Sequence, residues 1–185
     1  MQGLGGAEAV QGYDIRLTGD EGRSVAPGQI GDLWVRGASI AQSYWNRPEL
    51  TAARMRDGWF FSGDKYIQDE DGYFWYAGRS DDMFRVSGEW VSPIEVEGAL
   101  VEHPAVLESA VVPYKDENEL WKPKAYVVLK PGYRPGAELA AELQDFVKRR
   151  IARYKYPRRI EFLAELPKTA TGKIQRFRLR AETSR

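Results

Sequence analysis

Residues 167–176 read PKTATGKIQR and are the segment of this chain best suited to act on an anion. A glycine and small hydroxyl residues predict a mobile loop with Lys173 at its tip. A flexible ammonium can reach an anion and follow negative charge as that charge moves during a reaction. The segment is not a P-loop, because the spacing GxxxxGK is missing and no strand leads into a helix there. An exposed basic loop without a chemical role is the alternative interpretation.

Three further residues have the chemistry to hold a nucleotide or its derivatives. Asp64, in the sequence SGD, is a carboxylate on a predicted turn and could accept two hydrogen bonds from ribose hydroxyls. Arg79, in the sequence GRSD, offers a rigid fork of donors suited to phosphate. Gly88 would let a ligand approach the backbone closely. A common turn explains Asp64 at least as well. A surface hairpin that leads into a capped helix is the alternative for residues 78–97, but it explains neither the RSDD cluster nor Gly88.

The first eighty residues are predicted to be all-β with one short helix. Alternating apolar and polar residues predict strands at residues 13–17 and 32–36. A proline at its entry favours a short helix at residues 48–55. Asp-Gly dipeptides at residues 57–58 and 71–72 lie beside aromatic runs, and the second is a good hairpin signal.

The pattern changes after residue 80. Ser92 is a predicted helix N-cap, followed by Pro93 and by Glu95 at the third helical position, which completes a capping box. The other predicted elements are strands at 109–113, 125–129 and 159–163, a polar excursion at 115–124, and helices at 136–153 and 174–182. The fold class is therefore α+β: a small β-rich subdomain at residues 1–80, followed by a compact α+β domain at residues 81–185.

Composition excludes several classes of protein. Six Trp, ten Tyr, seven Phe and 43% hydrophobic residues indicate a folded globular chain rather than a disordered one. With no cysteine, disulfides, zinc-thiolate sites and a Cys nucleophile are excluded, and a cytoplasmic location is expected. Neither a signal peptide nor an apolar run long enough to cross a bilayer is visible. Residues 148–185 hold thirteen Lys or Arg and three Glu, which suits a nucleotide, a nucleic acid or simply a solvated basic face.

Together, in this order and at these spacings, the segments resemble the adenylate-forming superfamily of acyl-CoA synthetases, firefly luciferases and peptide-synthetase adenylation domains. SGD is similar to the T-G-D motif, GRSD to the G-R-x-D motif, and residues 167–176 to the P-K-T-x-x-G-K-I-x-R motif. Residues 31–51 resemble the G-E-L…G-Y…P-E-x-T stretch, although Asp32 and Ser43 stand where Glu and Gly are usual.

Within that superfamily, residues 86–97 and 120–125 are similar to benzoate-CoA ligases and related aryl-CoA ligases. Arg85 and Glu89 depart from that group, in which most sequences carry Lys and Gln. The resemblance extends over nearly the whole chain. It implies that the second domain is of the AMP-binding enzyme C-terminal type.

The resemblance also implies a reaction and a set of site residues. In the first step a carboxylate attacks the α-phosphate of ATP, giving an acyl-adenylate and pyrophosphate, and in the second CoA replaces AMP. The implied roles are catalysis by Lys173 in the first step, ribose and nucleotide binding by Asp64 and Arg79, a hinge at Asp81, and CoA binding by Ser87 and Gly88. No metal ligand is expected in this chain.

The same family implies parts that this chain lacks. Its phosphate loop, acyl pocket and the acidic residue associated with Mg²⁺ belong to a large N-terminal domain, so the chain is expected to be inactive without that domain. The expected partners are that domain, a small carboxylate, ATP and CoA, with no membrane and no nucleic acid. A fragment of an aliphatic acyl-CoA synthetase or another adenylate-forming enzyme is the alternative. A stand-alone module that binds a nucleotide or nucleic acid is a further one.

Overall fold

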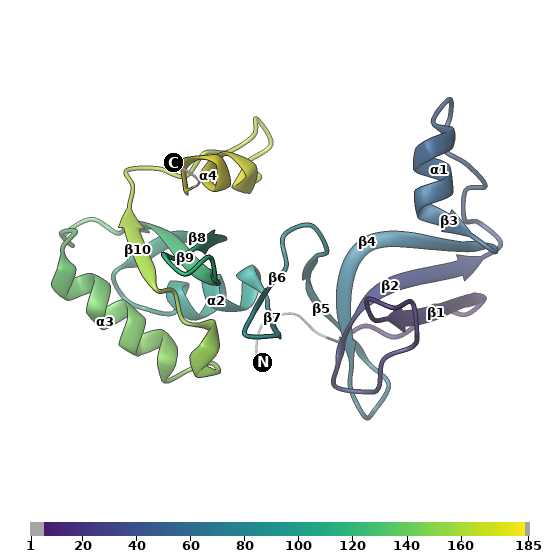
Figure 1. Ribbon diagram of the computed structural model, residues 1–185, viewed down its shortest axis with the longest axis horizontal. Coiled ribbons are helices and arrows are strands. Elements are labelled where there is room, and N and C mark those ends of the chain that lie inside the picture. The colour runs from purple at the N-terminus through teal and green to yellow at the C-terminus, as the bar shows by residue number, and fades with distance from the viewer. Residues whose placement is uncertain (1–5, 184–185) are drawn as a thin grey trace. The chain divides into compact units, whose positions relative to one another are not determined.

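In the computed structural model, which describes residues 6–183, the chain folds into two compact units that divide between Asp81 and Asp82 (Figure 1). The first unit is built mainly from strands and the second combines strands with helices. The predicted α+β class is therefore confirmed. The division lies one residue from the predicted boundary.

The first unit is an antiparallel sheet with strand order β1-β2-β4-β3, and β5 also pairs with β4, farther along the edge that β3 occupies. Its predicted strands, short helix and Asp71-Gly72 hairpin are all present. The helix ends at Arg54, because Met55 already pairs with Phe60 as part of a short strand. The elements are β1 Tyr13–Thr18, β2 Ile30–Gly37, α1 Pro48–Arg54, β3 Met55–Arg56, β4 Trp59–Gln68 and β5 Phe74–Arg79.

The second unit contains a two-stranded hairpin, a three-stranded sheet and three α-helices among its described residues. In the larger sheet β9 is central, with β8 antiparallel on one side and β10 parallel on the other. Ser92 caps the first of the helices as predicted, since its hydroxyl accepts the Glu95 N–H at 3.2 Å. The elements are β6 Phe84–Val86, β7 Glu89–Val91, α2 Pro93–Val101, β8 Val106–Lys115, β9 Trp121–Leu129, α3 Ala137–Lys148, the 3-10 turn η1 Arg153–Lys155, β10 Arg159–Phe162 and α4 Arg176–Thr183.

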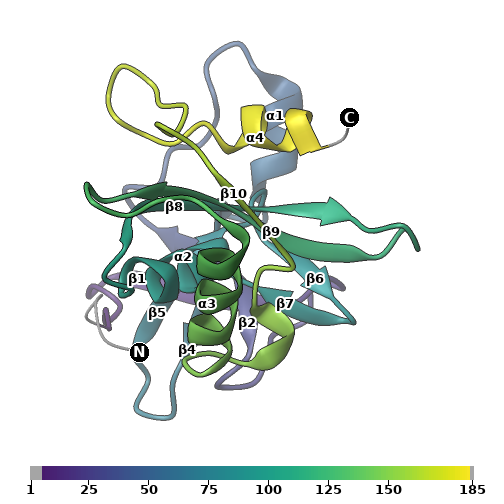
Figure 2. The same cartoon turned by 90° about the vertical axis from the view of Figure 1, so that its left-hand side faces the viewer.

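The three-stranded sheet is covered on both faces. Val111 and Val127 point to one face and pack with α2 and α3, whereas Val112 and Tyr126 point to the other face and pack against Leu179 of α4. This follows from the alternation of side chains along a strand. Figure 2 shows α2 and α3 on one side of the strands and α4 on the opposite side. Burial on both faces explains why the central strands read as apolar runs.

Two predicted elements have different bounds in the structure. Half of the polar excursion at residues 115–124 is strand, because Lys115 pairs with Trp121 and the turn shrinks to residues 116–120. The long helix ends at Lys148 rather than at residue 153. The chain must reverse after α3 so that β10 can run parallel to β9, and Ile151 packs against the core from this reversal.

Leu143 of α3 is fully buried in the core between the helix and the sheet. Leu143→Ala should lower the free energy of unfolding of the second unit by about 2–5 kcal/mol, because it removes apolar contact and leaves a cavity. Urea denaturation followed by amide NMR signals of this unit measures the change. Leu107→Ala is the matched control, since Leu107 is 51% exposed; a loss as large as that of Leu143→Ala would contradict the description of the core.

Candidate functional site

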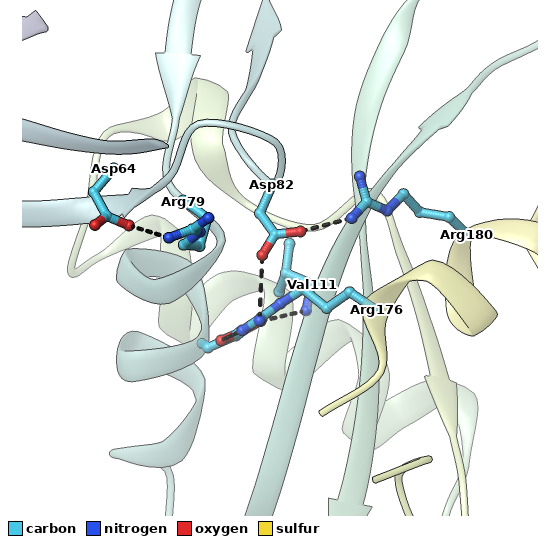
Figure 3. A network of polar contacts seen from close by, with 7 residues as sticks. Asp64, Arg79, Asp82, Val111, Arg176 and Arg180 are labelled. Carbon is cyan, nitrogen blue, oxygen red and sulfur yellow. Dashed lines mark hydrogen bonds and ion pairs between the residues drawn. The ribbon is translucent and has the colours of Figure 1, made fainter. Parts of the chain in front are cut away.

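Asp64 and Arg79 are brought together by the pairing of β4 with β5. The two residues are direct cross-strand partners, and Arg79 Nη1 donates to Asp64 Oδ1 at 3.0 Å (Figure 3). Their side chains are 25% and 48% exposed, respectively, so both can reach a ligand from solvent. Gly63 precedes Asp64 with a φ of +79°, a backbone conformation that residues with a side chain rarely adopt. Glycine is therefore required where the strand bends beside the pair.

The end of β5 is held within the first unit by a polar cluster that the sequence did not reveal. Lys65 is almost completely buried, and its ammonium lies 2.9 Å from Asp32 Oδ1. Ser80 donates its hydroxyl to the same oxygen at 2.7 Å and its N–H to the Gly63 carbonyl at 2.9 Å. A buried cation needs such partners to offset its lost hydration. Ser80, the residue before the predicted hinge at Asp81, is consequently anchored in the first unit.

Ser87 and Gly88 form the two-residue turn between β6 and β7. Both have positive φ, +54° and +87°, the combination found in type I′ hairpin turns. Apart from Gly88 itself and its two chain neighbours, no heavy atom of the described chain lies within 4 Å of the position that a Gly88 side chain would start from. Glycine is needed here for its backbone conformation, which was the alternative explanation of this residue. Close approach of a ligand to Gly88 stays a prediction.

The segment that carries Lys173 is a hydrogen-bonded turn. The Thr169 N–H donates to the Lys173 carbonyl at 2.8 Å, and the Gly172 N–H donates to the Thr169 carbonyl at 2.9 Å. The Thr169 hydroxyl also accepts the Lys173 N–H at 3.1 Å. Gly172 has a φ of +81°, which the turn requires. The backbone of the predicted mobile loop is therefore ordered by bonds within the segment.

The three cations of this segment differ in their partners. Lys168 forms an ion pair with Glu108 of β8 at 2.6 Å. Arg176 is paired with the carboxylate of Glu97 in α2. Its Nη2 donates to both carboxylate oxygens, at 2.7 and 3.0 Å. Lys173 is exposed, and its ammonium has no ion pair with another residue of the range 6–183. It is the cation that remains available to an external anion.

Arg176 and Glu97 belong to a polar network that sequence reasoning missed. Figure 3 labels Arg176, Asp82 and Arg180 of this network. Arg176 Nη1 lies 3.6 Å from Asp82 Oδ2, and Arg180 Nη2 lies 2.6 Å from Asp82 Oδ1. Burial raises the pKa of Glu97, while the hydrogen bonds and charge of Arg176 act in the opposite direction. Glu97 and Arg176 are far apart in sequence, so no local pattern could identify this pair. The only sequence signal was the arginine that ends the loop motif.

Part of the second unit matches a known domain family. Residues 95–173 match the AMP-binding enzyme C-terminal domain. That stretch of the chain belongs to this family. Lys173 is the last residue of the matched stretch, and Glu97 lies near its beginning.

Relatives extend the similarity beyond the AMP-binding C-terminal domain. The chain is 56% identical over 173 residues to a benzoate–CoA ligase of Thauera aromatica, covering 93% of this chain and 33% of the relative. It is 46% identical to a human mitochondrial acyl-coenzyme A synthetase, over 92% of this chain and 31% of the relative. The crystal structure of an anthranilate CoA ligase in complex with anthranoyl-AMP superposes with a TM-score of 0.87 at 48% identity, over 96% of this chain and 34% of that chain. The chain thus spans about a third of the length of its relatives.

The described residues contain neither a membrane-spanning helix nor a metal site. Between residues 6 and 183, no helix is long and apolar enough to span a membrane. In the same range no cluster of three or more His, Asp or Glu residues has an arrangement that could hold a metal ion.

The Ser87–Gly88 turn generates a stability prediction. Gly88→Ala should destabilise the second unit by about 1 kcal/mol, because L-residues with a side chain are strained at positive φ. Ser87→Asn is the matched control and should leave stability unchanged or slightly higher, because Asn favours the first position of a type I′ turn. Urea denaturation of both variants measures the difference. Equal stability of Gly88→Ala and the unaltered chain would argue against the turn described here.

Proposed function

We propose that this chain is the C-terminal portion of an ATP-dependent aryl-CoA ligase, which forms an acyl-CoA from a carboxylate, ATP and CoA through an acyl-adenylate. The observation that carries the proposal is the exposed Lys173 ammonium on an ordered turn whose other cations are paired with carboxylates. Similarity to a benzoate–CoA ligase over 93% of the chain supports it. The identity to that ligase is 56%, against 46% to the human acyl-coenzyme A synthetase, which favours a ligase of the benzoate–CoA type. The acid itself would be selected by a pocket that is proposed to lie outside this chain.

Lys173 is the proposed catalytic residue of the first step. When a carboxylate oxygen attacks the α-phosphate of ATP, negative charge accumulates where the carboxylate and phosphate oxygens meet. An ammonium that contacts both groups stabilises this charge and reduces the repulsion between the two anions. Because the Lys173 ammonium has no ion pair within the described chain, it need not break one to do so.

Asp64 and Arg79 are proposed to bind the nucleotide together. A carboxylate can accept hydrogen bonds from the two ribose hydroxyls, and the adjacent guanidinium can donate to phosphate oxygens. Their 3.0 Å ion pair orients both groups before a nucleotide binds. This preorganisation lowers the entropy that binding would otherwise lose.

The second step is proposed to use the β6–β7 hairpin. In this proposal the domain from residue 81 onward turns about Asp81 between the two steps, which removes Lys173 and brings Ser87 and Gly88 to the pantetheine arm of CoA. Ser80 and Asp82, the neighbours of Asp81 in sequence, are each bonded into their own unit, which supports a pivot between them. The Mg²⁺ ion is proposed to bind to the N-terminal domain, which this chain does not include. The complete enzyme is proposed to be cytoplasmic.

The 185-residue chain by itself should form no acyl-CoA from benzoate, ATP and CoA. It spans about a third of its ligase relatives, and the pockets for the ATP phosphates and the acid are proposed to lie in the remainder. A coupled assay for AMP release measures this. The unfused chain mixed with the N-terminal two-thirds of the Thauera aromatica ligase is the informative second sample. AMP release that depends on benzoate and CoA from the chain alone would contradict the proposal.

Lys173→Ala should slow adenylation about a hundredfold to a thousandfold while leaving thioester formation nearly unchanged. The test uses a chimera in which this chain replaces the matching third of the Thauera aromatica ligase, with the unaltered chimera as reference. Pyrophosphate release reports the first step, and benzoyl-adenylate supplied with CoA reports the second. Lys168→Ala is the matched control, since Lys168 is already paired with Glu108. Equal losses in both half-reactions would refute a role confined to the first step.

A further inference from the structure

The C-terminal stem of the Lys173 turn is attached to the rest of the second unit by Arg176, the first residue of α4. Its guanidinium contacts the Glu97 carboxylate through both Nε and Nη2, at distances from 2.7 to 3.2 Å. The two side chains are only 20% and 12% exposed. A guanidinium held by several bonds to a largely buried carboxylate has a defined position and orientation.

Glu97 is itself fixed at the free edge of the sheet. The outer strand β8 directs the Val111 N–H away from β9, and Glu97 Oε1 accepts it at 2.8 Å. The backbone carbonyl of Glu97 accepts a hydrogen bond from the hydroxyl of Ser109, which precedes Val111 by two residues in β8. Glu97 lies on α2, which covers one face of the sheet, whereas α4 covers the other. The Glu97–Arg176 pair therefore joins the two helical layers around the edge of β8.

The same arginine is tied to the start of the second unit. Asp82 is the first residue of that unit, and its carboxylate lies between Arg176 and Arg180 of α4 (Figure 3). Tyr126 of the central strand adds a buried hydrogen bond from its hydroxyl to the Leu179 carbonyl, which holds α4 on the sheet. The beginning of the unit and the stem of the Lys173 turn are consequently parts of one network.

We propose that Arg176 is the positioning residue for Lys173. Its contacts with Glu97 hold the Lys173 turn at the edge of β8, and its contact with Asp82 connects the turn to the start of the second unit. This proposal rests on the role of Lys173 proposed above. A rotation about Asp81 then carries Lys173 as a rigid part of the unit. Misplacement by about 1 Å can cost on the order of a hundredfold in rate, so a loosened stem has a kinetic consequence.

Lys168, at the other stem of the turn, provides an internal comparison. Its pair with Glu108 is as short, at 2.6 Å, but both side chains are 37% exposed. Exposed single pairs contribute little because water and salt screen them and two long side chains must be ordered. Losing the Lys168 pair should therefore leave the turn in place, whereas losing the less exposed Arg176 should release it.

The first test measures hydrogen exchange in the 185-residue chain without ligands. In Arg176→Met, exchange of the Gly172 and Gln175 amides, which are bonded to Thr169 and Pro167, should accelerate about tenfold or more. Lys168→Met should change these rates less than about twofold, and Arg176→Lys should fall between the two because a lysine lacks the fork of donors. Arg176→Met combined with Glu97→Gln removes the unpaired buried carboxylate and keeps an acceptor for Val111, so it tests the contacts of Arg176 if the single variant unfolds. Unchanged exchange in the folded variants would overturn the proposal.

The second test measures both half-reactions in the chimera described above. Arg176→Met should slow pyrophosphate release about a hundredfold, with thioester formation from benzoyl-adenylate changed less than about threefold. General destabilisation would lower both, so the difference between the steps identifies positioning. If exchange accelerates but adenylation is unaffected, Arg176 has no positioning role. If Lys173→Ala does not slow adenylation, the proposed function is overturned. If Lys173→Ala slows adenylation but Arg176→Met does not, this inference alone is overturned.

Discussion

The second unit depends on the carboxylate of Glu97 at the open edge of the three-stranded sheet. An edge strand presents backbone groups that need partners, and Glu97 supplies one for the Val111 N–H. Burial disfavours the charge on this carboxylate, and Arg176 offsets that cost with several charge-assisted hydrogen bonds. Removing Arg176 would take from the largely buried Glu97 carboxylate the cation that offsets its lost hydration, so the two residues form one structural element.

This single pair links three segments that are distant in sequence. Glu97 comes from α2, the Val111 N–H from β8, and Arg176 from the end of the turn that carries Lys173. Asp82 extends the network to the first residue of the unit. A side chain proposed to act on a reacting phosphate needs such support, because a mobile lysine alone would lose much of its effect to disorder.

The first unit solves a similar problem with different groups. Lys65 is buried and paired with Asp32, and Ser80 bonds to the same carboxylate oxygen. These contacts hold the end of β5, where Arg79 meets Asp64 across the strands. In both units an exposed functional group is thus backed by a less accessible ion pair. The exposed group can meet a ligand because other side chains maintain its position.

Much of the architecture could be predicted from local sequence. The Ser92 cap, the Asp71-Gly72 hairpin and the apolar runs of β8 and β9 each depend on neighbouring residues, and all are present. The bounds at residues 115–124 and 149–153 were wrong, because cross-strand pairing and the return of the chain to β10 decide them. The motif residues Asp64 and Arg79 were identified separately, but their contact depends on the register of β4 and β5.

The sequence by itself determined the α+β class, the motifs and the identity of Lys173 as a cation on a loop. Only the tertiary structure decided which cations of that loop are engaged and which one is available. Glu97 is separated from Arg176 by most of the second unit, and Lys168 is similarly distant from Glu108. Local spacing carries no information on such pairs, because they form when α2, β8 and α4 pack around the same sheet edge.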